Sequence, residues 1–270
     1  MPKALDTTRA RPTTRNLTTF VLAITAVAVP LAYGVQLAAN KGYPSQIAVF
    51  SQILITPFMF VFPLISALLG SLRIYSEVGH RYASLVGTRR STRRYFAGRL
   101  LRSAVVPFMC YFVYAGLAFF IAYFIWPHVG NPGVDPSNYG MTKAQAEQAE
   151  LGDTSYSQVL GAGTLAYGFG YAAWLGISAA AYSMASVLCL VVLKNRLAAI
   201  ALPSALYLGQ SVLAIALVGP QAGLVYSVFP FGLTQLPVIV AAAPQLAVDI
   251  TVSLFAVYVL ITMRRKGYLT

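Results

Sequence analysis

Acidic residues are scarce in this chain. Its 270 residues include 7 Asp and Glu against 19 Lys and Arg, and charged residues of both signs make up only 10% of the total. Soluble domains average roughly 25% charged residues. The hydrophobic content is 58% and the mean hydropathy is +0.69. This composition excludes an ordinary soluble domain and predicts a polytopic membrane protein of the all-α class.

Motifs for catalysis are also missing. No lysine follows a glycine, so the chain lacks a GxxxxGK[ST] loop and cannot hydrolyse ATP through one. His80 and His128 lie far apart, and neither has partners for zinc or for a Ser/His/Asp arrangement. Cys110 and Cys189 have no CxxC neighbour and are interpreted as structural thiols. The sequence predicts no catalytic residue, no metal site and no cofactor bound by this chain.

Long uncharged stretches occur six times, and about 20 apolar residues suffice to cross the hydrocarbon of a bilayer. We expect membrane spans at residues 16–40, 46–70, 103–126, 164–193, 197–218 and 244–263. Pro57 and Pro63 fall inside the second span, where each frees a backbone carbonyl that a neighbouring helix must satisfy. Ala172, Gly176 and Ala180 form a small-residue ridge in the fourth span, where another helix can approach closely.

The connections between these stretches differ in character. Residues 127–163 form the longest polar loop, in which Thr142 and Gln145 predict the capping-box start of a short helix that ends near Leu151. Residues 219–243 are uncharged but interrupted by prolines and glycines, which predicts short helices that dip into the outer leaflet and return. The ends of the chain, 1–15 and 264–270, are expected to be tails.

Basic residues alternate between the two predicted sides of the membrane. The tails, the 72–102 connection and the turn at 194–196 carry seventeen Lys and Arg, and the other connections carry two. Basic segments stay in the cytoplasm. Both termini are therefore predicted to be cytoplasmic, in a plasma-membrane protein in contact with lipid. The same rule accounts for the net charge of +12 without nucleic acid as a partner.

The chain is organised around residues 72–102, which hold eight of the nineteen cations. Apolar residues recur there at spacings of three and four, as in an amphipathic helix, at Tyr75, Val78, Tyr82 and Leu85. Gly87 is expected to end this helix, and Ser91 is expected to cap a second helix that continues into the third span. We call residues 72–102 the elbow and predict that it is cytoplasmic.

The elbow resembles the cytoplasmic segment of six-span ABC exporter permeases of the type V, or ABC2-type, family. The resemblance rests on an acidic residue and a glycine, a short leucine-containing helix, a basic Ser/Thr/Arg turn, and the Gly98, Arg99 and Leu100 start of the third span. Arg99 stands where many relatives carry lysine. The resemblance implies that the elbow couples the spans to an ATPase, through Glu77, Gly79, Leu85, Gly87, Arg89, Arg90, Arg93 and Arg94.

Family membership would imply specific partners. Two permeases, either two copies or this chain with a paralogue, would stand side by side above two separate nucleotide-binding ATPase subunits, which bind ATP and Mg. The complex would export an amphipathic drug, an antimicrobial peptide or a lipid-like substrate. The second and fifth spans would line the path, with Phe58, Phe62, Tyr207 and Gln210 as candidate residues.

Two acids allow more than one interpretation. Asp249 is the single acid inside a span, so it either lines the substrate path or is a structural residue near the outer end of a helix that begins at Pro244. Glu77 either pairs with Arg81 one turn away on a wet helix face or belongs to the coupling surface.

The function also has alternatives. A secondary carrier or channel would need no ATPase, but it would be favoured by an inverted repeat and by paired charges at mid-membrane, which the sequence does not show. A membrane enzyme would need a cluster of His, Asp or Glu at one interface, and a structural assembly protein stays open.

Overall fold

The computed structural model describes residues 12–79, 92–130 and 133–266, and this part of the chain is helical and contains no β-strand. Five helices are long and apolar enough to cross a membrane, at 17–39, 96–129, 164–192, 196–217 and 238–262. A sixth crossing is completed if the pair 46–54 and 58–72, bent by 57°, counts as one span. The predicted all-α membrane protein is confirmed at this level.

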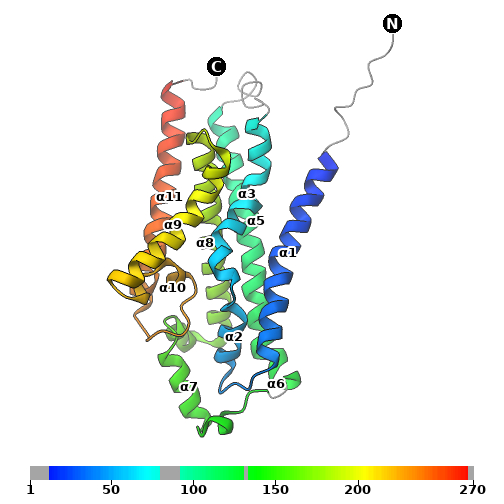
Figure 1. Ribbon diagram of the computed structural model, residues 1–270, viewed down its shortest axis with the longest axis vertical. Helices are drawn as coiled ribbons and strands as arrows, with labels where there is room; N and C mark the ends of the chain where they lie inside the picture. The colour runs from blue at the N-terminus through cyan, green and yellow to red at the C-terminus, as the bar shows by residue number, and fades with distance from the viewer. Residues whose placement is uncertain (1–11, 80–91, 131–132, 267–270) are drawn as a thin grey trace.

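The long helices run roughly along one direction and form the body of the molecule (Figure 1). They are α1 (Pro12–Ala39), α3 (Phe58–Gly79), α5 (Thr92–Phe120), α8 (Thr164–Val192), α9 (Arg196–Leu217) and α11 (Val238–Lys266). The start of α1, the end of α11, the end of α3 and the start of α5 lie at one end of the molecule, and α6 (Trp126–Val129) and α7 (Lys143–Gly152) lie at the other. We call these the basic end and the loop end.

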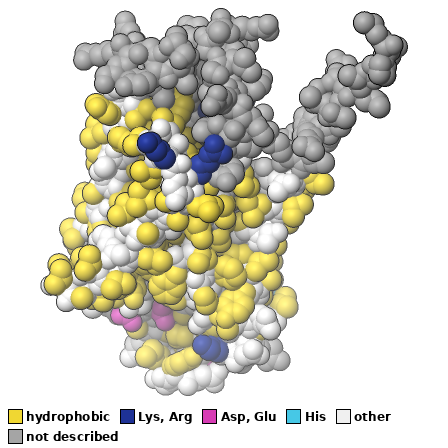
Figure 2. Space-filling view, turned by 45° about the horizontal axis from the view of Figure 1, so that its top comes forward, with side chains coloured by type: hydrophobic (Ala, Val, Ile, Leu, Met, Phe, Trp, Pro, Cys, Tyr) yellow, Lys and Arg dark blue, Asp and Glu magenta, His cyan; other side chains and the backbone are white. Residues whose placement is uncertain are grey.

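Charged side chains follow the same division. On the face shown in Figure 2, cations appear near the basic end, an apolar band lies below them, and acidic and basic side chains appear together toward the loop end. Many large apolar side chains of α1, α9 and α11 are exposed, among them Phe20, Leu213 and Leu254. Such exposure is expected of helices that face lipid.

The second predicted span is broken. α2 (Gln46–Leu54) ends before Pro57, which starts a separate helix direction in α3. Pro57 and Pro63 lack the N–H groups that would bond to the carbonyls of Ile53 and Met59 in a regular helix. The hydroxyl of Tyr114 on α5 donates to the Ile53 carbonyl at 3.4 Å, and that of Tyr207 on α9 donates to the Met59 carbonyl at 3.2 Å. The expected satisfaction of proline-freed carbonyls by neighbouring helices is confirmed.

α8 lies at the centre of the helix packing. A Cβ added at Gly176 would lie 2.9 Å from the Phe108 ring on α5, and one added at Gly168 would lie 2.6 Å from the Phe119 ring. Ala172, between these glycines, is fully buried. The predicted small-residue ridge therefore forms the contact between α5 and α8. Ala180 is only partly buried and extends this ridge less completely.

The loop end is ordered by local capping and two isolated bridges. α7 begins after Thr142, and the predicted capping box between Thr142 and Gln145 is present. Two β-bridges, Tyr43 with Val134 and Thr154 with Phe231, join this region to the ends of other segments. α5 is extended by a π-helical turn at Ile121–Ile125 and by α6, so the third crossing reaches Val129 rather than Trp126.

Two helices differ in length from the sequence-based prediction. α3 continues without a break to Gly79, so the elbow is not separated from the second span at Leu72. α11 begins at Val238 and contains Pro244 six residues later, so Pro244 does not begin the helix. A proline in the first turns of a helix is tolerated when its freed carbonyl finds another partner. The interrupted segment before α11 is correspondingly shorter than 219–243.

Candidate functional site

The interrupted segment between α9 and α11 folds back onto the helices. It contains a 3-10 turn at Pro220–Ala222 and the short helix α10 (Leu224–Val228), most of which is buried. The first N–H groups of α10 are bound by α9, because the Gln210 amide oxygen accepts from Leu224 N at 2.8 Å and the Ser211 hydroxyl accepts from Val225 N at 3.0 Å. These contacts satisfy donors that a helix leaves free at its start.

The carbonyls at the other end of α10 are satisfied by aromatic side chains. The Tyr156 hydroxyl and the Trp174 indole N–H both donate to the Ser227 carbonyl, at 2.8 and 3.1 Å. The Tyr171 hydroxyl donates to the Val228 carbonyl at 3.1 Å. Non-helical backbone at membrane depth is stable only where protein groups replace water in this way.

A polar chain connects α10 to the middle of α11. The Tyr182 hydroxyl of α8 donates to the Gln245 amide oxygen at 2.9 Å, and the Gln245 amide nitrogen donates to Asp249 Oδ1 at 2.8 Å. The Ser227 hydroxyl also accepts from Gln245 N at 3.2 Å. Tyr182 and Gln245 are buried, whereas Asp249 Oδ2 is buried with no hydrogen-bond partner in the described part of the chain. We call Tyr182, Gln245 and Asp249 the polar triad.

The position of Asp249 differs from the one expected. It lies eleven residues after Val238 and thirteen before Thr262, which are the ends of the membrane-spanning part of α11. At about 1.5 Å per residue, the start of the helix is about 16 Å away. The helix dipole acts within the first turn and therefore does not stabilise this carboxylate. The argument for Asp249 as a residue near a helix end does not hold.

An aromatic cluster surrounds one side of the polar triad. Phe62 of α3 is 1% exposed, and its ring centroid lies 5.8 Å from that of Tyr182. The Tyr182 ring lies in turn 5.4 Å from Tyr207 of α9. Further rings close the cluster around Phe62, at 4.7 Å for Tyr111 and 5.7 Å for Phe229. These side chains bring α3, α5, α8 and α9 together at the level of the break in the second span.

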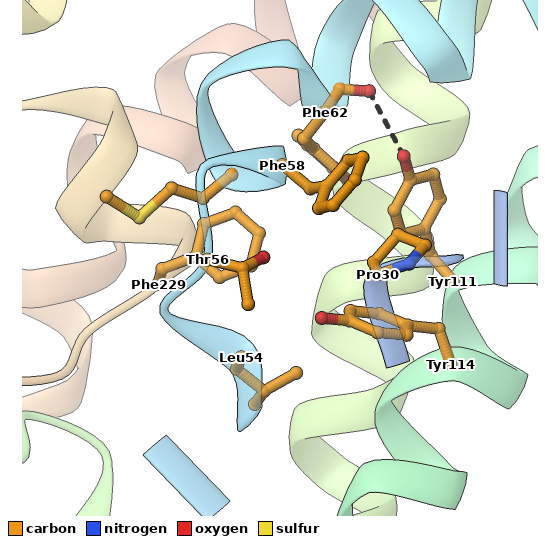
Figure 3. A pocket seen from close by; sticks show the side chains of 9 residues that line it. Pro30, Leu54, Thr56, Phe58, Phe62, Tyr111, Tyr114 and Phe229 are labelled. Atoms are coloured by element: carbon orange, nitrogen blue, oxygen red, sulfur yellow. Dashed lines mark hydrogen bonds between the residues drawn. The ribbon is translucent and has the colours of Figure 1, made fainter. Parts of the chain in front are cut away.

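A small cavity lies beside this cluster (Figure 3). Its volume of about 10 Å³ has room for roughly one water molecule. Thr56, in the break between α2 and α3, lines it with a buried hydroxyl that has no partner among the described residues. The cavity is too small for a transported molecule.

The predicted path residues are only partly brought together. Phe62 and Tyr207 belong to the same buried cluster, with ring centroids 6.4 Å apart. Phe58 lies at the edge of the cavity and packs against Tyr33 of α1. Gln210 uses its amide to hold α10, donating to the Ala222 carbonyl at 2.9 Å as well as accepting from Leu224 N. This geometry favours a structural role for Gln210.

Four of the eight predicted coupling residues lie on described helices at the basic end. Glu77 and Gly79 belong to the last turn of α3, and Arg93 and Arg94 belong to the first turn of α5. α5 begins at Thr92, and the expected cap Ser91 lies outside the described residues. The remaining coupling candidates fall outside the described residues, and these are Leu85, Gly87, Arg89 and Arg90.

Sequence reasoning missed two members of the polar triad. Tyr182 is one of 17 tyrosines, and nothing in its neighbourhood along the chain sets it apart. Gln245 offered a usable signal, because it stands one turn before Asp249 on the same helix and an amide at that spacing can bond to a carboxylate. The partner on α8 depends on long-range packing.

The described residues contain no group of three or more His, Cys, Asp or Glu placed to hold a metal ion. The arrangement is instead one carboxyl group that accepts a hydrogen bond from a neutral amide in an apolar helix bundle. Comparisons of the chain with protein-family models, curated proteins and solved structures found no match.

Proposed function

We propose that this chain is the membrane-spanning permease subunit of an ATP-driven ABC exporter of the type V class. In this proposal the basic end faces the cytoplasm of a cell whose plasma membrane holds the protein, in line with the excess of Lys and Arg there. Separate ATPase subunits bind ATP and Mg and dock beneath the elbow. A second permease, identical or paralogous, stands beside the first, and an amphipathic drug, peptide or lipid-like molecule is exported.

The observation that supports this proposal best is the length of α3 and α5 at the basic end. α3 continues past the apolar region to Gly79, and α5 begins at Thr92 as one helix that reaches Phe120. Two long helices that extend beyond the apolar band are suited to transmit force from a soluble motor at the basic end. α5 then packs along α8, where the glycine contacts bring the two helices close together.

The short buried segment between α9 and α11 adds support. The resembled family is expected to carry short re-entrant helices between its fifth and sixth spans, and α10 occupies the corresponding place in the chain order. Its ends are satisfied by α8 and α9 side chains rather than by its own residues. Such a segment is stable at membrane depth and can close the outer end of a path.

A secondary carrier is the second candidate, and one observation favours it. Asp249 lies at the middle of an apolar helix with one oxygen unpartnered among the described residues. A carboxylate in that position is a candidate proton or ion site in carriers that use a gradient. A carrier would work without ATPase subunits, so the two candidates differ in their source of energy.

The deciding experiment is purification of the tagged chain from the membranes of its natural host, followed by reconstitution in liposomes. The exporter proposal expects a P-loop ATPase to copurify and ATP hydrolysis to depend on its association with the chain. It also expects transport to require ATP inside and to persist when the proton gradient is collapsed. Transport by the chain alone, driven by a proton gradient without ATP, would replace the exporter with the carrier.

A further inference from the structure

The polar triad presents a negative charge that the described chain leaves half satisfied. Asp249 is the only acid in the predicted spans, and Gln245 supplies a donor to one of its oxygens. No Lys, Arg or His occurs in 164–193, 197–218 or 238–262. A charged side chain in the middle of a membrane span is costly unless it is paired. An ionised Asp249 therefore calls for a positive ligand.

The triad holds the carboxyl group of Asp249 through a series of buried donors. Tyr182 donates to Gln245, and Gln245 donates to Asp249, so both hydrogen bonds run toward the carboxylate. Hydrogen bonds donated to a carboxylate stabilise its charged form. Gln245 is fully buried and Tyr182 is 2% exposed, so neither donor has to be desolvated when a ligand arrives. Asp249 Oδ1 is thus fixed in position, while Oδ2 stays without a partner among the described residues.

The side chains around the polar triad are apolar, which indicates that the uncharged part of the ligand is apolar. Asp249 itself is partly exposed, and the neighbouring α11 side chains Leu246 and Ile250 are 37% and 58% exposed. On the buried side lies Tyr182, whose ring packs against that of Phe62 at 5.8 Å. A ligand at this boundary would place its charge at Asp249 and its apolar body along α11.

We propose that the polar triad recognises the positive group of an amphipathic organic cation, and that the transported substrates belong to this chemical class. That these cations are transported rests on the proposed function, whereas their binding to the polar triad needs no ATPase. Among the described side chains of the elements packed against α11, the charged ones are Arg99 and Arg102, on the first part of α5 at the basic end. A proton competes with the organic cation for Asp249.

Binding of tetraphenylphosphonium to the full-length chain in lipid nanodiscs tests the proposal. This probe has a permanent delocalised charge and an apolar body, and triphenylphosphine oxide is its neutral counterpart. Equilibrium dialysis is expected to show that Asp249→Asn weakens binding of the cation by at least about tenfold, because the charge interaction in a desolvated site is lost. Asp249→Glu is expected to retain binding, and the neutral probe should bind equally to all variants.

Two controls make the result specific. Asp153→Asn removes an exposed acid at the loop end and is expected to leave cation binding unchanged. Lowering the pH should weaken binding of the cation to the unaltered chain and leave Asp249→Asn insensitive, because the probe itself does not titrate. This second measurement decides the matter on the unaltered protein even if Asp249→Asn fails to fold.

Three results would show that the polar triad does not bind the cation. Cation binding that is the same in the unaltered chain and Asp249→Asn, binding that is independent of pH, or no binding by the unaltered chain would overturn the proposal. If only the exporter assignment is wrong, the chain would still bind the cation, but no ATPase would associate with it. ATP-driven export of a neutral substrate alone, without cation binding, would keep the exporter and reject this site.

Discussion

The hydroxyl of Tyr207 on α9 donates a hydrogen bond of 3.2 Å to the carbonyl of Met59 on α3, the group that Pro63 deprives of its helical donor. Pro57 and Pro107 likewise leave the carbonyls of Ile53 and Ser103 without a helical donor. Hydroxyls of other helices bond to both, Tyr114 to Ile53 at 3.4 Å and Ser183 to Ser103 at 2.8 Å. Bends in the spans and contacts between spans are therefore coupled.

Replacing Tyr207 by Phe should destabilise the protein by about 1 kcal/mol, because a buried carbonyl loses its donor while the ring packing is kept. The stability lost on Tyr207→Phe should be smaller in the Pro63→Ala background, where residue 63 regains an N–H group that can bond to the Met59 carbonyl. Denaturant unfolding in detergent, followed by circular dichroism, measures both effects. Tyr258→Phe is the matched control, because Tyr258 is 63% exposed. Equal losses with and without Pro63 would show that the two groups are independent.

Gly70 marks a second close contact, where α3 crosses α5 and α8. A Cβ at this position would collide with the Ser183 hydroxyl and lie 2.5 Å from the Ser103 carbonyl oxygen. Gly70→Ala should therefore cost about 1–3 kcal/mol by overpacking and by disturbing the hydrogen bond that serves Ser103. Gly116→Ala is the control, since no other atom lies within 4 Å of the added carbon. A shift in thermal unfolding that is alike in both variants would contradict the proposed crossing.

Much of the fold follows from patterns that the sequence displays directly. Uncharged runs and the distribution of Lys and Arg give the crossings, and the capping box at Thr142 gives α7. The ends of helices near prolines are harder to predict from the sequence. Pro57 ends one helix direction, whereas Pro63 and Pro244 lie within helices. The carbonyls freed by Pro57 and Pro63 both receive a tyrosine hydroxyl from another helix, so neither the proline itself nor its local pattern tells which of the two breaks the helix.

The candidate site was predictable in one residue of three. Asp249 is conspicuous because an acid in an apolar run is costly. Its depth was misjudged, since the helix was expected to begin at Pro244 rather than Val238. Tyr182 reaches Gln245 across 63 residues of sequence, and such a pairing follows from the packing of α8 against α11. Gln210 shows the reverse case, a polar residue in a span that serves the fold.

The loop end offers a test by pH. Burial, aided by the nearby charge of Asp153, raises the pKa of the Glu150 carboxyl on α7. The folded protein then binds this proton more tightly than the unfolded chain, so stability falls as the pH rises from about 4.5 through the folded pKa. Glu150→Gln should stabilise the protein at pH 7 by at most about 1 kcal/mol, because solvent screens a half-buried group.

Thermal unfolding of Glu150→Gln at a series of pH values measures this effect. The advantage of the variant should disappear below about pH 4.5, where the carboxyl group is protonated in both states. Glu147→Gln, an exposed acid on the same helix, serves as the control. A stabilisation by Glu150→Gln that persists unchanged at low pH would point to the amide itself rather than to the removed charge.

The exporter proposal requires that side chains at the basic end couple ATP hydrolysis to movement of the spans. Arg93 and Arg94 lie in the first turn of α5, a single helix that continues to Phe120 and packs along α8. A push delivered to the first turn is therefore carried along a rigid element into the core. The paired change Arg93→Ala and Arg94→Ala should lower substrate-stimulated ATP hydrolysis by roughly tenfold, the size of a typical coupling between sites, and leave the basal rate of the ATPase unchanged.

In the exporter proposal Glu77, on the last turn of α3, is a second contact with the motor, so Glu77→Gln should reduce stimulation in the same assay. Lys194→Ala removes an exposed cation from the turn between α8 and α9 and is the matched control for loss of charge at this end. Copurification of the ATPase with each variant separates weakened docking from weakened transmission. Retained docking with lost stimulation would place these residues in force transmission, since the motor is then bound and active. Full stimulation in all variants would mean that the elbow is not the coupling element.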